Sequence, residues 1–167
     1  GEINLQGWIN IDANQNTHIH MIDKNFKLNN LKDETISEFY LCHVLEHFSF
    51  TESIELIKKI QQKLKKNGVI RISVPDFQKL SSIYSLNSNL DQIKFALMGG
   101  QKDNYDYHKS IYDHPGLTRI LEDCKFGEIS EWNYEDFGVK IGDWSEGYYK
   151  VQNKKIEISL NLKGIKL

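Results

Sequence analysis

The densest run of chemically reactive side chains lies in the segment FYLCHVLEHFSF, residues 39–50. His43 and His47 stand four residues apart, Glu46 precedes the second histidine, and Cys42 precedes the first. The pattern His-x-x-Glu-His occurs in one class of zinc metallopeptidases, in which both histidines face the metal from one side of a helix. A zinc site is therefore one hypothesis for this segment.

The residues that lead into His43 favour a strand instead of the helix that such a zinc site needs. Phe39–Cys42 is an apolar, strand-forming run, and the first helix-capping residue comes only at Ser49. The motif then straddles a strand end and the following turn, where His43 and His47 need not face one point. No third ligand is evident in the sequence, so we predict no metal site. Two hypotheses rank higher: hydrogen-bonded residues at a strand end, or a ligand cleft beside the carboxyl ends of parallel strands.

Length and composition are those of a single globular domain, residues 1–167. Forty per cent of the 167 residues are hydrophobic, which is enough for a buried core. The net charge of −2 argues against a nucleic-acid partner. There is no apolar run of about 18 residues and no signal-peptide pattern, so we expect no membrane partner. The cysteines, Cys42 and Cys124, are expected to be free thiols, as in a cytoplasmic protein.

The clearest predicted helix spans residues 49–68. Ser49 and Glu52 have the spacing of a capping box, and Ile57, Ile60 and other aliphatic residues repeat along one face. Lysines gather toward its end, where the helix dipole favours cations, and Gly68 marks the stop. We therefore interpret the basic run in KKIQQKLKK as a solvated helix end.

Strand and helix patterns alternate along the rest of the chain. Further helices are expected at residues 77–84, 90–98 and 117–127, and a long polar, aromatic loop at residues 99–116. Strands are expected at residues 8–13, 17–23, 36–44, 69–76, 128–137 and 154–167. This order predicts an α/β fold with a mostly parallel sheet and an antiparallel C-terminal pair of strands at its edge.

Three segments resemble, in order, the bacterial class I S-adenosylmethionine (SAM)-dependent methyltransferases. They are GWINIDA, the run from ISEFYLCHVLEH to RISVPDF, and GGQKDNYDYHKSIYDHPGLTRILEDCKFGEI, which together cover about Gly7 to Ile129. Within that family the chain is similar to the type 11 group, in which a strand ends in H-V-L-E-H and the next reads R-I-x-V-P-D. The resemblance implies a Rossmann-like methyltransferase fold and methyl transfer from S-adenosylmethionine to an unknown small-molecule or saccharide acceptor.

The resemblance also implies roles in cofactor binding. Asp12, after WINI, matches the acidic residue that accepts hydrogen bonds from the ribose hydroxyls, and Asp23, after HIHMI, matches the acceptor for the adenine amino group. Cys42 and Glu46 match positions that flank the cofactor in the cleft. For both aspartates, a turn-forming role without a ligand stays open.

Two histidines are candidates for catalysis. If the methyl acceptor must lose a proton, His43 or His108, in the YDYHK loop, could take it. A purely structural role stays open for each.

One element of the family pattern is missing. Family members begin with a strand and a glycine-rich Gly-x-Gly-x-Gly turn that opens a helix, whereas only GEINLQG precedes the second-strand motif here. A parallel crossover takes about a dozen residues, so the first β-α unit is absent from this sequence. The alternative function is therefore a degenerate, non-catalytic protein that binds a ligand or partner without SAM. A homo-oligomer in which another subunit closes the gap is also compatible with the sequence.

Overall fold

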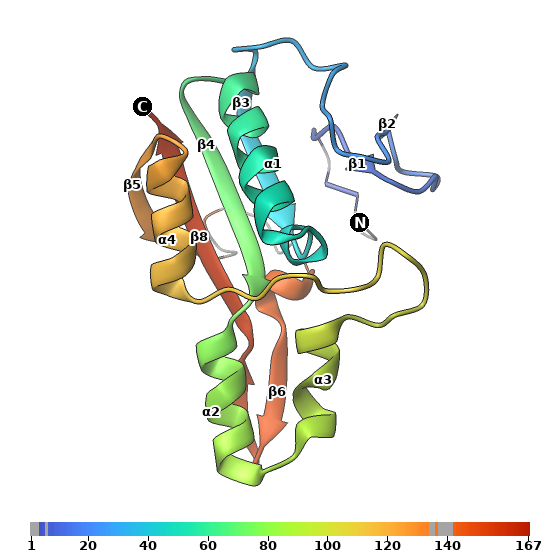
Figure 1. The fold of residues 1–167 in the computed structure, drawn as a ribbon, viewed down its shortest axis with the longest axis vertical. Helices are drawn as coiled ribbons and strands as arrows, with labels where there is room; N and C mark the ends of the chain where they lie inside the picture. The colour runs from blue at the N-terminus through green and yellow to red at the C-terminus, as the bar shows by residue number, and fades with distance from the viewer. Residues whose placement is uncertain (1–3, 6, 134–135, 137–141) are drawn as a thin grey trace.

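The computed structural model describes residues 4–5, 7–133, 136 and 142–167. Its centre is a four-stranded sheet in the order β3-β4-β8-β5. The strands are β3 (Ile36–Cys42), β4 (Leu64–Pro75), β8 (Ser159–Lys166) and β5 (Phe126–Glu131). β3 and β4 are parallel, and β8 runs antiparallel to both β4 and β5. This mixed sheet, with an antiparallel pair at one end, confirms the predicted α/β fold class (Figure 1). The sheet is not mostly parallel as predicted, because β8 runs antiparallel to both of its neighbours.

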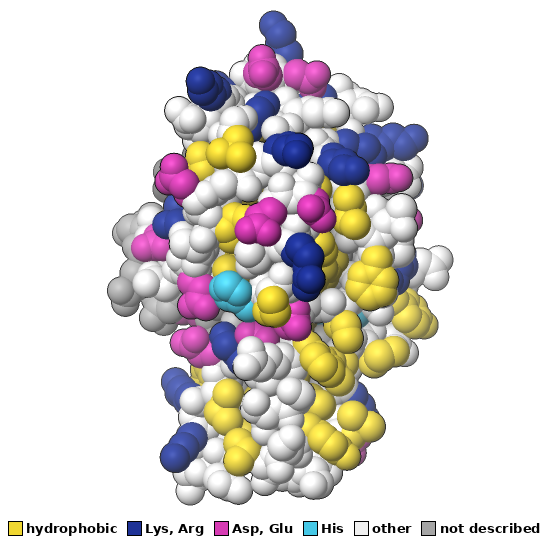
Figure 2. All heavy atoms as spheres, turned by 60° about the vertical axis from the view of Figure 1, so that its left-hand side comes forward, with side chains coloured by type: hydrophobic (Ala, Val, Ile, Leu, Met, Phe, Trp, Pro, Cys, Tyr) yellow, Lys and Arg dark blue, Asp and Glu magenta, His cyan; other side chains and the backbone are white. Residues whose placement is uncertain are grey.

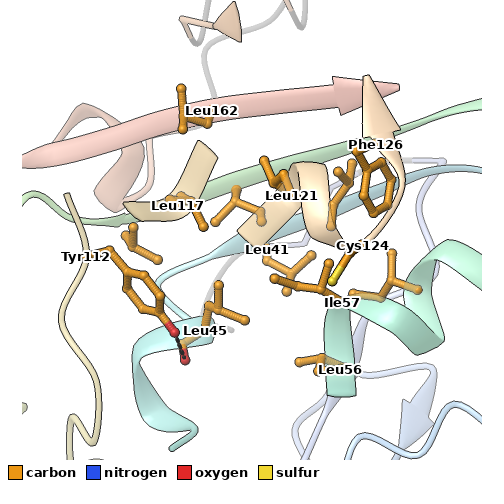
Figure 3. Close-up of a cluster of buried hydrophobic side chains, with 14 of the residues drawn as sticks. Leu41, Leu45, Leu56, Ile57, Tyr112, Leu117, Leu121, Cys124, Phe126 and Leu162 are labelled. Atoms are coloured by element: carbon orange, nitrogen blue, oxygen red, sulfur yellow. Dashed lines mark hydrogen bonds between the residues drawn. The ribbon is translucent and has the colours of Figure 1, made fainter. Parts of the chain in front are cut away.

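Two helices, α1 (Phe50–Lys63) and α4 (His114–Asp123), cover the face of the sheet that is turned toward the viewer in Figure 1. Their apolar faces meet the sheet in one core, part of which is drawn in Figure 3. Ile57 of α1 and Leu121 of α4 are fully buried there. Burying one such side chain contributes about 1.5–3 kcal/mol to stability. No helix among the described residues is both long and apolar enough to cross a membrane.

A smaller hydrophobic cluster lies below the main sheet in Figure 1. It is formed by α2 (Phe77–Asn87), α3 (Leu90–Met98) and the hairpin of β6 (Tyr148–Val151) and β7 (Lys154–Glu157), with Leu80 and Ile83 at its centre. On the face shown in Figure 2, hydrophobic side chains gather toward this lower end, whereas cationic and acidic side chains are interspersed above it. That face therefore presents no single basic patch.

The first two strands, β1 (Ile11–Asp12) and β2 (Met21–Ile22), form a separate parallel pair. They lie beside α1 and apart from the main sheet in Figure 1. Both are shorter than the sequence predicts, with two residues each. An isolated two-stranded pair has little support from neighbouring strands, which limits its regular hydrogen bonding.

Several predicted boundaries need correction. The helix predicted for residues 49–68 ends at Lys63, because Leu64 is extended and pairs with Ile36 of β3. The lysines at 65 and 66 therefore belong to β4 and not to a helix end. α4 begins at His114, where Asp113 caps it and Pro115 occupies its first turn, three residues before the predicted start.

The predicted C-terminal strand is also divided. Its alternating pattern runs unbroken through Ile158, yet β7 ends at Glu157 and β8 begins at Ser159. Ile158 instead donates its N–H to Gly147 O and accepts from Asp76 N at its carbonyl, 2.9 and 2.8 Å away. Tertiary hydrogen bonds therefore separate a hairpin strand from a sheet strand. Of the strand predicted at 128–137, residues 134–135 and 137 lie outside the described residues.

Candidate functional site at the carboxyl end of β3

The motif His-x-x-Glu-His begins where β3 ends. β3 stops at Cys42, and His43 takes a left-handed backbone conformation with φ 50°. One 3₁₀ turn, η1 (Leu45–His47), then carries Glu46 and His47. This confirms that the motif straddles a strand end and a turn and is not the α-helix of a zinc peptidase.

The turn η1 is anchored from both sides. The Leu45 side chain is fully buried, and Tyr112 Oη donates to Leu45 O at 3.4 Å (Figure 3). The backbone carbonyl of Glu46 accepts from Lys109 N at 2.7 Å and from Ser110 N at 3.2 Å. These hydrogen bonds attach the long segment between α3 and α4 to the end of β3.

That attachment brings His108 beside Glu46, although the two are far apart in the sequence. His108 Nε2 lies 4.0 Å from Glu46 Oε1, and His43 Nδ1 lies 3.2 Å from the same oxygen. The rings of His47 and His108 meet edge to face, with centroids 4.7 Å apart. The structure thus groups three predicted site residues, His43, Glu46 and His108, and adds His47.

The protonation of His43 can be deduced from its contacts. Its Nε2 lies 2.9 Å from Ser159 Oγ. That hydroxyl donates its own proton to Trp144 O at 2.6 Å, so it accepts from His43. Nε2 of His43 therefore carries the proton in the neutral ring, and the lone pair of Nδ1 faces Glu46.

The same reasoning applies to the other two rings. His47 Nδ1 lies 3.2 Å from Tyr107 O, and His108 Nδ1 lies 2.9 Å from Ala96 O. A carbonyl oxygen can only accept, so both Nδ1 atoms donate and both Nε2 atoms keep their lone pairs in the neutral rings. Burial lowers the pKa of His108 and so favours the neutral ring, although the nearby Glu46 charge acts in the opposite direction.

Cys42 lies next to this group and faces the same cleft. Burial raises the pKa of its thiol, and the negative charge of Asp143 raises it further. Asp143 is held in place by Tyr40, whose hydroxyl donates to Asp143 Oδ2 at 2.6 Å. At neutral pH Cys42 is therefore a thiol and not a thiolate nucleophile.

The two predicted aspartates differ in their surroundings. Asp12 ends β1 and lines the cleft, and its Oδ1 accepts from Asn14 N at 2.8 Å. Asp23 follows β2, where Oδ2 accepts from Leu28 N at 2.7 Å and Oδ1 from Asn25 N at 3.3 Å. Asp23 is not among the described residues that line the cleft. The structure thus places Asp12 in the site and gives the Asp23 carboxylate a turn-stabilising role.

A single large cleft connects these residues. It lies between the β1–β2 pair and the edge formed by β3 and α1, and its volume is about 1500 Å³. Small-molecule sites usually measure about 300–1,000 Å³, so this cleft exceeds the space that one such ligand fills. Its lining includes the residues Asp12, Cys42, His43, His47 and His108.

Several solved structures are similar to this arrangement of strands and helices. A SAM-dependent methyltransferase from Archaeoglobus fulgidus superposes with a TM-score of 0.59 at 17% identity, over 95% of this chain and 75% of that chain. For a SAM-dependent methyltransferase from Methanosarcina mazei the TM-score is 0.55 at 14% identity, covering 92% of this chain and 71% of that one. The chain has the fold of SAM-dependent methyltransferases.

A third such protein, from Thermotoga maritima, gives a TM-score of 0.55 at 12% identity and covers 90% of this chain and 65% of that chain. Sequence comparisons add nothing to this, since no protein-family model and no curated protein matches the chain. At these low identities the likeness concerns the fold. The carboxyl end of β3 lies at this cleft, and open α/β sheets bind ligands at the carboxyl ends of their strands.

Proposed function

We propose that this chain is a SAM-dependent methyltransferase domain of the type 11 kind, acting on a small-molecule or saccharide acceptor. The observation that carries the proposal is the cleft in a methyltransferase fold, with Asp12 on one wall and the His43–Glu46–His108 group on the other. The walls come from the carboxyl ends of β1 and β3. This is where an open α/β sheet places its ligand.

The residues present fit the adenosine half of the cofactor. Asp12 offers carboxylate oxygens to the ribose hydroxyls at the open end of β1, and Cys42 lines the opposite wall. Glu46 is buried behind that wall, where its Oε1 lies 3.2 Å from His43 Nδ1. Asp23 remains a candidate acceptor for the adenine amino group. Its carboxylate already accepts two backbone hydrogen bonds, so it would use its remaining lone pairs for adenine. For the methionine half, this sequence holds no Gly-x-Gly-x-Gly turn.

When bound, SAM would supply an activated methyl group on a sulfonium. The main work of the protein in such an in-line displacement is to align the acceptor. An acceptor hydroxyl must also lose its proton, and the inward lone pair of His43 Nδ1 or His108 Nε2 could take it. Glu46 then stabilises the imidazolium that forms on His43, since Oε1 lies 3.2 Å from Nδ1.

The second candidate function is a non-catalytic protein that binds a ligand or partner in the cleft without SAM. The cleft volume, which is larger than one small ligand needs, favours it. Direct measurement of cofactor binding separates the two functions.

We expect S-adenosylhomocysteine, titrated calorimetrically, to bind with a Kd below about 100 μM, and Asp12→Ala to weaken it tenfold or more. Asp33→Ala is the matched control, because Asp33 is exposed, pairs with Lys63 and does not line the cleft. It should bind like the unaltered chain. No heat of binding at millimolar ligand would reject the methyltransferase proposal for this chain and favour the second candidate.

A further inference from the structure

Glu46 is a buried carboxylate whose charge is not balanced by hydrogen bonds. Only 1% of the residue is exposed, and within the described residues neither Oε1 nor Oε2 has a hydrogen-bond partner. An ionised carboxylate in such surroundings is strongly disfavoured unless a proton or a cation accompanies it. Something positive is therefore required at this point.

The hydrogen bonds of the three neighbouring histidine rings run to groups other than Glu46. Their outer nitrogens donate to Ser159 Oγ, Tyr107 O and Ala96 O. Lone pairs thus remain on the inner nitrogens, and two of these, His43 Nδ1 and His108 Nε2, lie 3.2 and 4.0 Å from Glu46 Oε1. Lone pairs that face a carboxylate repel it, unless a cation lies between them.

We propose that Glu46, His47 and His108 bind a divalent first-row transition-metal ion, with zinc as the best match. One ligand atom from each of the three residues lies within 4.8 Å of the other two. Ligands bound tetrahedrally to zinc lie about 3.3 Å apart, so modest side-chain rotations close the site.

The ligand set decides the class of metal. Two imidazoles and one carboxylate suit zinc, iron, cobalt or manganese, whereas magnesium and calcium prefer oxygen ligands throughout. Three protein ligands also leave a position open for water or substrate, as in catalytic metal sites. The site opens into the cleft, which His47 and His108 help to line.

The surroundings of the ligands are those that metal sites use. A metal-binding histidine almost always donates its second ring nitrogen to a carbonyl or carboxylate, which fixes the tautomer and the ring direction. Tyr107 O and Ala96 O do this for His47 and His108. The backbone bonds from Lys109 and Ser110 to Glu46 O fix the two ligand-bearing segments to each other.

This proposal revises the sequence-based prediction that no metal is bound. That prediction rested on the missing third ligand and on the strand-turn geometry of the motif. In the structure, His108 comes from another segment and provides the third ligand. The proposed set is then Glu46 and His47 of η1 with His108, instead of two histidines on one helix. As a ligand, His108 would no longer be free to act as a base, which would leave His43 in that role.

The metal site does not rest on the proposed methyl transfer, so binding is measured directly. Protein stripped with a chelator is titrated with Zn²⁺ and with Co²⁺, whose absorption spectrum reports its ligands. We expect one ion per chain, a Co²⁺ spectrum without a thiolate charge-transfer band, and binding at least about 100-fold weaker in His47→Ala and His108→Ala. His114→Ala, which alters an exposed histidine of α4, should bind as the unaltered chain does.

Glu46→Gln separates metal binding from a structural role. It removes the buried charge, so the metal-free variant should unfold at the same or a higher temperature than the metal-free parent, while its zinc affinity falls. The proposal is overturned if neither ion binds at a 1:1 ratio at millimolar concentration, or if Glu46→Gln and His47→Ala both bind with full affinity. Magnesium that binds as tightly as zinc would overturn the assignment to a transition metal.

Discussion

Burial sets the chemical state of the individual side chains around the end of β3. It raises the pKa of the Cys42 and Cys124 thiols and of the Tyr40 hydroxyl. It lowers the pKa of His108. All four groups are therefore held in their neutral forms at neutral pH.

At the residue scale, this makes both cysteines slow to alkylate. We expect the folded chain at pH 7.5 to react with iodoacetamide at least about tenfold more slowly than free cysteine, because the thiolate is the reacting form and a raised pKa depletes it. Mass spectrometry of the two cysteine peptides over time measures the rate, and chain unfolded in urea is the control. Fast labelling of Cys42 in the folded state would show that a thiolate is present in the cleft.

At the scale of elements, short local signals place the reactive residues. Ser49 caps α1 with a complete capping box: Glu52 N donates to Ser49 Oγ at 3.4 Å and Ser49 N to Glu52 Oε2 at 2.9 Å. Because α1 begins there, η1 and the proposed metal ligands that it carries are confined to the few residues after β3. Asp113 similarly caps α4 and ends the loop that carries His108.

We expect Ser49→Ala to lower the free energy of unfolding by about 1 kcal/mol, since one helix N–H loses its acceptor. Thr51→Ala, in the same exposed turn, is the control and should change stability less. Hydrogen bonds from Ser49 lower the pKa of Glu52, so the Glu52 half of the box is present at neutral pH and is lost as pH falls through its folded-state pKa. Urea unfolding at neutral and acidic pH tests both points, and equal stability of the two variants would contradict the capping assignment.

At the scale of the whole molecule, the chain divides into a well-supported sheet and a weakly supported cleft wall. β4 pairs with β3 on one side and β8 on the other. Within the described residues, β1 and β2 pair only with each other, through two residues each. The proposed ribose acceptor, Asp12, lies on the weaker wall and the proposed metal ligands lie on the stronger one. A ligand that contacts both walls would then hold the β1–β2 pair in place against the end of β3.

We expect backbone amides of β1 and β2 to exchange with deuterium at least about 100-fold faster than those of β4 and β8, because local opening there breaks few contacts. Hydrogen-exchange mass spectrometry of peptides that cover residues 8–23 and 69–75 measures the difference. If S-adenosylhomocysteine binds as proposed, the exchange of residues 8–23 slows when it is added. Equal protection of both regions without ligand would show that the two walls form one cooperative unit.

The sequence by itself determined the features that local patterns encode. The apolar run before His43 predicts a strand, Ser49 with Glu52 predicts the start of α1, and the order of strands and helices predicts an α/β fold. The methyltransferase fold is implied by the resemblance of three segments to that family. These signals are sufficient because hydrophobic periodicity and capping act between residues only a few positions apart.

Only the tertiary structure decided which reactive residues meet. His108 reaches Glu46 through backbone hydrogen bonds between segments about sixty residues apart, and no local pattern carries that information. The division of the C-terminal strand at Ile158 has the same cause, because the backbone of Ile158 forms hydrogen bonds with Gly147 and Asp76. The burial of Glu46, whose carboxylate has no hydrogen-bond partner in the described part of the chain, also arises from packing, so the site could be placed only in the folded chain.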